Sequence, residues 1–395
     1  MFSTLWQQLD QLLYQYQPFW RFLPFYQVEP GWQHPALQAW LDRLSEAQLD
    51  QLELHEPWRR QQLADFFPQL AAVTDWIVAR QTEAKPAAEA MPFWLARDIK
   101  GRKQQQIEFW VEQLPDLPLP LLEWCAGKGH LGRWLSSSKS RQVLSLEWQA
   151  ELCAQGEAEA RRLQLAQTFV QADVLQPASQ QYLQAKQHAV ALHACGDLHL
   201  QLLRSAAARQ TQQLDLIPCC YHLIAQPDYR GLSQQAQQGQ LLPLSKEQLK
   251  LAVQSQSTAG ERIARLRHLE VWWRLSYQAL YQHCTGQQHY RPLDSVAKHW
   301  FSGEFRAFAD FAAAAHGWSI PDDLDVTPFL AEGAARQRQV RRQQLVRSVF
   351  APALELYLVL DRVLYLQEQG YQVQLQRFCP AALTPRNWWI SAARC

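Results

Sequence analysis

The sequence contains no long apolar stretch, although 48% of its 395 residues are hydrophobic. No apolar run reaches the roughly 18 residues that a membrane-spanning helix needs, so no membrane partner is expected. The opening residues, M-F-S-T-L-W-Q-Q-L-D, include neither the basic segment nor the cleavage site of a secretory signal. These absences predict a cytoplasmic protein.

An excess of charge of either sign is also missing, since 38 Lys and Arg face 37 Asp and Glu, a net charge of +1. This balance excludes a uniformly basic nucleic-acid surface but allows a local basic patch. The eight cysteines form no C-x-x-C pair and no zinc-type spacing, so no metal is predicted. Cys219 and Cys220 are adjacent, which does not suit a mutual disulfide. This cysteine usage is typical of a reducing compartment.

The strongest local pattern is L-P-L-L-E-W-C-A-G-K-G-H-L, residues 119–131. It predicts a buried strand ending near Glu123, a glycine turn and a helix, which together form the nucleotide-binding opening of a doubly wound α/β sheet. The spacing of Gly127 and Gly129 fits both NAD and S-adenosylmethionine (SAM). The acid four residues before Gly127 favours SAM, because a carboxylate repels a pyrophosphate and attracts the ammonium group of SAM.

Acids also end the next two predicted strands. Glu147 follows Q-V-L-S-L, 24 positions after Glu123, where a carboxylate can accept both ribose hydroxyls. Asp173 ends T-F-V-Q-A, where an acid can accept the adenine amino group. The predicted cofactor-binding residues are Glu123, Cys125, Ala126, Gly127, Gly129, Glu147, Asp173, Val174 and His193.

Two further strands place polar residues at the same sheet edge, where ligands bind in open α/β sheets. The fourth, H-A-V-A-L-H-A-C, leads into Gly-Asp-Leu, and the fifth, L-D-L-I-P-C-C, leads into Tyr-His. His193, Asp197 and His222 are the candidate general bases, and Tyr221 is a candidate substrate contact. A covalent role for Cys219 or Cys220 in attack on a pyrimidine is a further hypothesis.

The strand–helix alternation is interrupted twice. The sequence predicts a helical N-terminal domain at residues 1–80 and a linker at 81–97. It also predicts a helical insertion after strand five, at 226–346, which covers the substrate. Residues 98–225 and 347–395 would form the SAM-binding domain. Basic residues near the predicted entrance and on the last helix of the insertion are either solvated or contact phosphate. They are Lys100, Lys103, Arg338, Arg341 and Arg342.

Three motifs together, E-W-C-A-G-K-G-H-L-G-R, H-A-C-G-D-L and C-C-Y-H, resemble a group of class I methyltransferases. The group includes the methyltransferase-like (twenty-five) family and the protein named for an rRNA adenine dimethylase domain. The tail, with A-P-A-L-E-L-Y-L-V-L-D-R-V-L-Y-L and T-P-R-N-W-W-I, is similar to the same group. The resemblance covers about 98–222 and 348–394. It implies a seven-stranded class I sheet, SAM binding, and a role for residues 193–197 and 219–222.

The resemblance leaves the acceptor open. Adenine dimethylases carry N-[LI]-P-[YF] after strand four, where this sequence has H-A-C-G-D-L, so methylation of an adenine amino group is not implied. The sequence predicts a SAM-dependent methyltransferase with RNA as the preferred acceptor. The alternatives are a protein methyltransferase, or a catalytically silent SAM-fold module that binds RNA or a partner. The oligomeric state does not follow from the sequence.

Overall fold

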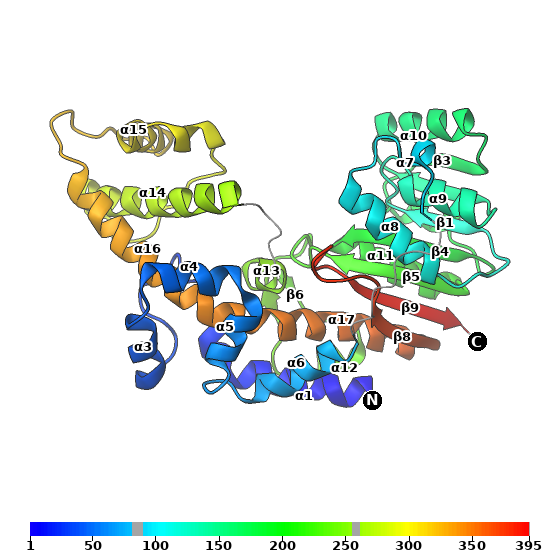
Figure 1. Cartoon of the computed structure of the whole chain (residues 1–395), viewed down its shortest axis with the longest axis horizontal. Helices are drawn as coiled ribbons and strands as arrows, with labels where there is room; N and C mark the ends of the chain where they lie inside the picture. Colours follow the sequence, from blue (N-terminus) through cyan, green and yellow to red (C-terminus); the bar gives the residue numbers. More distant parts are fainter. Residues whose placement is uncertain (81–89, 255–260, 395) are drawn as a thin grey trace. The chain divides into compact units, whose positions relative to one another are not determined.

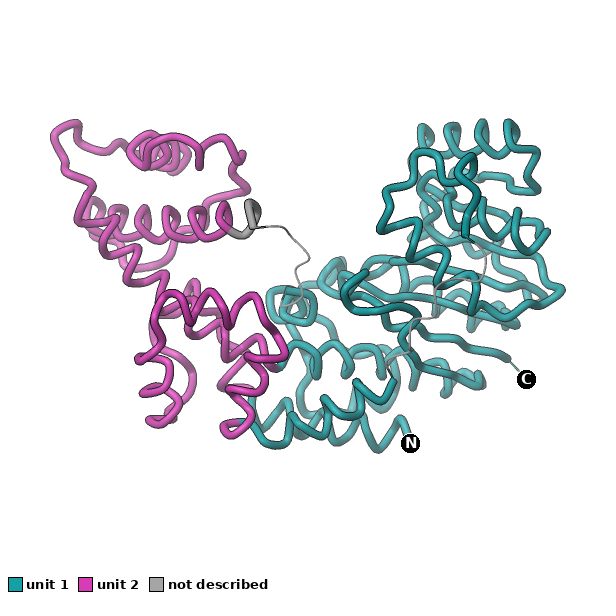
Figure 2. The backbone as a smooth tube through the Cα atoms, viewed as in Figure 1, with its two compact units in different colours: residues 1–16, 67–256, 350–395 teal, residues 17–66, 257–349 magenta. Residues whose placement is uncertain are grey.

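The computed structural model describes residues 1–80, 90–254 and 261–394. The chain forms two compact units (Figure 2). Unit 1 contains residues 1–16, 67–256 and 350–395, and unit 2 contains residues 17–66 and 257–349. Each unit is therefore built from segments that are distant in the sequence.

Unit 1 contains a seven-stranded sheet of order β3-β2-β1-β4-β5-β9-β8 (Figure 1). Strands β1 to β5 are parallel, and β9 runs antiparallel to both β5 and β8. This topology confirms the predicted α/β sheet of class I methyltransferases. The strands are β1 Leu121–Trp124, β2 Val143–Glu147, β3 Gln167–Gln171, β4 His188–Cys195, β5 Gln213–Cys219, β8 Tyr371–Arg377 and β9 Trp388–Arg394.

Helices alternate with the strands, as the periodicity predicts. The helices of unit 1 are α1 Phe2–Gln15, α6 Gln69–Val78, α7 Phe93–Ala96, α8 Gly101–Gln113, α9 His130–Ser138, α10 Ala150–Arg162, η1 Pro177–Tyr182, α11 Asp197–Arg209, α12 Gln234–Gln237, α13 Lys246–Gln254 and α17 Ala351–Glu368. A short ribbon of β6 Asp228–Tyr229 and β7 Leu244–Ser245 follows β5.

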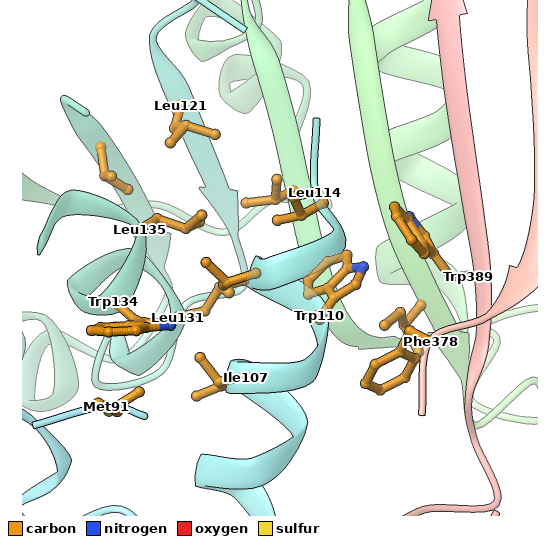
Figure 3. Close-up of a cluster of buried hydrophobic side chains, with 14 of the residues drawn as sticks. Met91, Ile107, Trp110, Leu114, Leu121, Leu131, Trp134, Leu135, Phe378 and Trp389 are labelled. Atoms are coloured by element: carbon orange, nitrogen blue, oxygen red, sulfur yellow. The ribbon is translucent and has the colours of Figure 1, made fainter. Parts of the chain in front are cut away.

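A hydrophobic cluster fixes α8 and α9 on one face of the sheet (Figure 3). Ile107 and Trp110 come from α8, and Leu131 and Trp134 come from α9. Strands β1, β2, β4, β5 and β9 supply the facing residues Leu121, Val143, Val190, Ile217 and Trp389. Because side chains alternate along a strand, Leu214 and Leu216 of β5 point to the opposite face.

Helix α17 is buried along nearly its whole length, and α1, α6, α11 and α13 contact it. Three charged residues of α17, Glu355, Asp361 and Arg362, are buried, and the last two bond to neighbouring segments. Asp361 accepts hydrogen bonds from the backbone of Leu232 and Ser233 at 2.9 and 2.8 Å. Arg362 donates to the Tyr229 hydroxyl at 2.9 Å and to His199 at 3.2 Å. These bonds tie the loop after β5 to the helix.

Unit 2 is helical. Its elements are α2 Gln17–Trp20, α3 Pro35–Asp42, α4 Glu46–Leu54, α5 Glu56–Leu63, α14 Glu261–Thr285, η2 Lys298–Ser302, α15 Phe305–Ala315 and α16 Thr327–Ser348. Trp273 of α14 packs against Phe301, Phe305 and Phe308 in the core of this unit. Ser45 begins α4 with a reciprocal capping box to Gln48, which separates α4 from α3.

The two units differ from the predicted domain ranges. Residues 1–16 and 67–80 belong with the sheet, because α1 presents Trp6, Leu9 and Leu13 on one face and Trp6 stacks on Tyr357 of α17 at 5.0 Å. Residues 228–254 also belong to unit 1.

Much of the predicted linker, at 81–89, lies outside the described residues. Among the described helices, none has both the length and the apolar character to span a membrane.

Candidate functional site

The turn between β1 and α9 has the backbone shape that the glycines predict. Gly127 and Gly129 have φ of +60° and +66°, and Cys125 also has a positive φ, +59°. A Cβ on Gly129 would lie 2.3 Å from the Phe169 ring, whereas one on Gly127 would meet no atom of the described residues within 4 Å. Packing therefore requires the glycine at position 129. Gly127 leaves space beside the backbone, where a ligand can approach.

The carboxylate of Glu123 is hydrogen-bonded inside the protein rather than free at the strand end. Its carboxylate is buried beneath α9, where Oε2 accepts from Ser145 Oγ at 2.7 Å and from Gln167 Nε2 at 3.4 Å. A Cβ on Gly132 would lie 2.4 Å from the same oxygen. Burial raises the pKa of Glu123 to about 7, despite hydrogen bonds from Ser145 and the Gly132 backbone. This surrounding argues against the predicted contact with the ammonium group of SAM and gives Glu123 a structural role.

Two other predicted acids lie at the ends of their strands. Glu147 accepts from the Gly127 amide through Oε2 at 2.9 Å and from the Gln149 amide through Oε1 at 3.0 Å. Asp173 accepts from the Leu175 amide at 3.0 Å and from Gln176 at 3.1 Å. Glu147 therefore links β2 directly to the glycine turn, while Asp173 holds the loop after β3.

Cys125 shows that these groups converge. Burial raises the pKa of its thiol, and the charges of Glu147, Cys195, Asp173 and Glu123 raise it further. The other two predicted cofactor contacts of this region are buried. The amide of Ala126 donates to the Leu146 carbonyl at 2.8 Å, and Val174 is buried after β3. The carboxyl ends of β1 to β4 thus surround one location, as an open α/β sheet requires.

His193 lies in a β-bulge near the end of β4. The register of β4 against β5 shifts between Leu192 and Ala194, and His193 has φ of +61°. Its Nε2 donates to Gln106 Oε1 of α8 at 2.9 Å. Burial, reinforced by Lys103, lowers the pKa of His193 to about 4, so the imidazole is neutral at neutral pH. Bulges often reorient a side chain beside a site, and no periodic pattern in the sequence reveals one.

The other two candidate bases differ in their surroundings. Asp197 begins α11 and accepts from the Ala225 amide at 2.6 Å, so its carboxylate fastens the loop after β5. Gly196 has φ of +52°, and a Cβ there would lie 1.9 Å from the Leu223 carbonyl oxygen. The imidazole Nδ1 of His222 is buried and has no hydrogen-bond partner among the described residues. Of the three candidates, Asp197 is therefore primarily a positioning residue.

Tyr221 is not at the surface where a substrate contact was predicted. Its ring is fully buried against His199, and Arg362 lies over the ring at 5.3 Å. The hydroxyl donates to Glu355 of α17 at 3.5 Å. Burial raises the pKa of this hydroxyl well above its ordinary value. Tyr221 therefore belongs to the core that anchors the loop after β5.

The arginines of α16 are largely neutralised within unit 2. Arg341 donates to Glu46 at 2.8 Å, to Asp50 at 2.5 Å and to Glu53 at 2.9 Å, and its side chain is only 11% exposed. Arg342 donates to backbone carbonyls of Asp42 and Leu44, and Arg338 lies 3.8 Å from Glu46. These acids come from the N-terminal segment, so no pattern local to α16 indicates them. They argue against the predicted phosphate contacts, most strongly for Arg341.

The predicted basic residues of α8 and two further cations remain near the strand ends. Lys100 begins α8 and is exposed, as is Lys103. Lys103 and Lys128 both lower the pKa of the buried His130, and Arg386, in the loop between β8 and β9, lowers those of His193 and Cys220. Sequence reasoning assigned Gln106 and Arg386 no role, because their partners are supplied only by the fold.

Unit 2 contains a separate cavity of about 730 Å³. Its lining includes Trp272 and Phe301 together with the basic residues Arg265, Lys298, His268 and His299. The indole of Trp272 donates to the Leu330 carbonyl at 2.9 Å, which fixes its ring. The cavity thus combines aromatic surface with positive charge.

A family model described as a methyltransferase domain matches residues 102–227. This match agrees with the predicted enzyme class and with SAM as its cofactor. Among solved structures, the chain resembles a geranyl diphosphate methyltransferase bound to GPP and sinefungin, with 14% identity, TM-score 0.26, and coverage of 29% of this chain and 45% of that one. The chain therefore spans less than half of that structure.

Two further solved structures are similar over a comparable segment. One is the geranyl diphosphate C-methyltransferase of Streptomyces coelicolor A3(2), with 12% identity, TM-score 0.26, and coverage of 36% of this chain and 60% of that one. The other is an rRNA methylase from Streptococcus thermophilus, with 13% identity, TM-score 0.24, and coverage of 30% and 72%. Similarity at this level supports no conclusion about the acceptor.

Proposed function

We propose that the chain transfers a methyl group from SAM to RNA. The observation that carries the cofactor half is the open backbone at Gly127, which Glu147 and Asp173 flank from the adjoining strand ends. Glu147 already accepts from the Gly127 amide at 2.9 Å, so its carboxylate lies where it can accept ribose hydroxyls. The matched methyltransferase domain includes all three residues.

Positive charge around the acceptor position supports a polyanionic substrate. Lys103, Lys128 and Arg386 act electrostatically on His193, His130 or Cys220, although the whole chain is nearly neutral. A local cluster of this kind can bind phosphates without a basic surface elsewhere. The aromatic and basic cavity of unit 2 suits a nucleobase stacked beside the backbone of a single strand.

Methyl transfer from SAM is an in-line displacement at the sulfonium methyl carbon. The protein aligns the acceptor with this carbon, and such alignment accounts for much of the rate acceleration. His193 is neutral and its Nε2 carries a proton donated to Gln106, so Nδ1 keeps a lone pair. This nitrogen can accept a proton from an acceptor that is protonated at neutral pH. His222, whose Nδ1 has no hydrogen-bond partner among the residues that the structure describes, is the second candidate base.

Calorimetric titration with SAM tests the cofactor half. Glu147→Gln is expected to weaken binding by about 1.5–3 kcal/mol, which is the usual loss for a hydrogen bond to a charged group. Glu151→Gln is the matched control, because Glu151 is exposed on α10 and bonds only the neighbouring Gln155 in the described structure. The assignment fails if wild-type protein does not bind SAM, or if the two variants bind equally well.

Transfer of labelled methyl groups from SAM to extract of cells lacking the protein tests the acceptor. Label that nuclease removes supports RNA. The double variant Lys103→Gln, Lys128→Gln is then expected to lower RNA affinity and flatten its salt dependence, without changing SAM affinity. Lys186→Gln is the control, since this exposed lysine precedes β4 and therefore lies at the amino ends of the strands, away from the carboxyl ends.

A protein acceptor is the second candidate. Its support is the internal neutralisation of Arg341 by Glu46, Asp50 and Glu53, together with the net charge of +1. Label that resists nuclease and is released by protease would establish this acceptor in place of RNA. A silent RNA-binding or partner-binding module would bind SAM weakly or not at all and transfer no label.

A further inference from the structure

Three cysteines meet at the carboxyl ends of β4 and β5. Cys195 and Cys219 end the two strands and are register partners across them, and Cys220 follows directly. The Sγ atoms of Cys195 and Cys219 are 3.2 Å apart, and all three sulfurs lie within 4.8 Å of one another. The separation of 24 residues between the strand ends matches no zinc-binding motif, so the sequence alone gives no sign of this cluster.

The backbone holds the thiols in this arrangement. Both Cys195 and Cys219 donate to the carbonyl oxygen of His193, at 3.5 and 3.3 Å, and the bulge in β4 places that carbonyl between them. Cys220 has φ of +47°, a left-handed conformation that costs a non-glycine residue about 1–3 kcal/mol. The fold therefore maintains a strained residue in order to direct the third thiol toward the other two.

We propose that Cys195, Cys219 and Cys220 bind a Zn²⁺ ion through their three thiolates. Tetrahedral zinc with Zn–S bonds of 2.3 Å separates its sulfurs by about 3.8 Å, which lies within the spacing observed here. Three thiolates form a soft ligand set, which favours Zn²⁺ over Mg²⁺ or Ca²⁺. Among the described residues, no other His, Cys, Asp or Glu ligand atom lies within 4.8 Å of all three sulfurs, so the fourth position is open to water or the acceptor.

The burial and exposure of the three residues are graded: Cys219 is buried, whereas Cys195 and Cys220 are half-buried, which leaves an entry path for the ion. Binding releases the remaining thiol protons to the solvent, and no electron is transferred.

The full-length chain, reduced and stripped of metal, provides the test. We expect it to bind one equivalent of Zn²⁺ in competition with a chromophoric chelator. Co²⁺ in its place is expected to give the intense thiolate-to-metal charge-transfer absorption of a tetrahedral site. Cys195→Ser and Cys220→Ser should each abolish this absorption, while Cys284→Ser, at an exposed cysteine of unit 2, should retain it.

Thermal melting of each variant distinguishes loss of the site from loss of the fold. Cys220→Ser is the decisive variant, because its side chain is half-buried and its removal leaves β4 and β5 intact. The proposal is overturned if the reduced, folded wild type takes up no metal, or if folded Cys220→Ser binds Co²⁺ with unchanged absorption. It is also overturned if the native protein carries a Cys195–Cys219 disulfide and binds no metal after reduction. None of these outcomes depends on the acceptor or on SAM binding.

Discussion

Replacing Glu123 by glutamine separates its structural role from the predicted contact with SAM. The side chain is fully buried, and burial raises its pKa to about 7 from an ordinary value of 4.5. This difference corresponds to about 3 kcal/mol of folding free energy. Because the pKa is raised, the folded state is most favoured below pH 4.5, where Glu123 is protonated in both states. Stability is lost as the pH rises from 4.5 through 7, where the buried group must ionise.

Glu123→Gln keeps the shape of the side chain and an oxygen that can accept from Ser145 and the Gly132 backbone, but it cannot ionise. We therefore expect it to be more stable than wild type at pH 8, by up to about 3 kcal/mol, and similar at pH 4.5. Urea unfolding midpoints at the two pH values measure the difference. Glu151→Gln, on an exposed part of α10, should show no such pH dependence.

The same variant is expected to bind SAM as wild type does. A structural role is refuted if Glu123→Gln is no more stable relative to wild type at pH 8 than at pH 4.5. A loss of SAM affinity of about 1.5 kcal/mol or more, with stability unchanged, would restore the direct contact predicted from the sequence.

Three further predictions concern neighbouring residues. The pKa of His193 is lowered to about 4, so the rate of methyl transfer with His193 as the base should be constant from about pH 5.5 to 8 and should fall at lower pH. An inflection in the rate near pH 6.5 would exclude this desolvated imidazole as the base. Gly196→Ala should cost more than about 3 kcal/mol in thermal unfolding, because its Cβ would meet the Leu223 carbonyl, whereas Gly370→Ala, also at positive φ but in open space, should cost about 1 kcal/mol. Arg341→Met should lower the free energy of unfolding in urea by about 1–3 kcal/mol, whereas Arg338→Met, at a half-exposed arginine, should lower it by less than about 0.5 kcal/mol. Equal effects would show that the ion pairs of Arg341 do not stabilise the protein.

The sequence predicts the sheet well because each strand carries its own pattern. The apolar runs and the turn glycines are local signals, so the five strands placed by their own residues agree with the structure to within a few residues. The resemblance implies the remaining two strands, which the structure shows as the antiparallel pair of β8 and β9. Local pattern also places Glu147 at the end of β2, as the structure has it, whereas Asp173 lies two residues beyond the end of β3.

The predictions that differ from the structure depend on contacts across the chain. Glu123 ends a strand, as predicted, but Ser145 and Gln167 from neighbouring strands take its carboxylate. Tyr221 follows a strand that ends beside the site, yet α17, more than a hundred residues later, covers its ring. Arg341 belongs to a basic run whose acids lie near residue 50. In each case the partner, rather than the residue itself, decides the role.

The interleaving of the two units has a consequence for synthesis on the ribosome. The chain passes between units at residues 16–17, 66–67, 256–257 and 349–350, so neither unit is a continuous product of translation. Helix α1 is synthesised long before α17, on which it packs, and the sheet acquires β8 and β9 only after α17 has been made. The apolar face of α1 therefore has no partner until the ribosome has made the more than three hundred residues that separate α1 from α17, and during that interval it can associate wrongly.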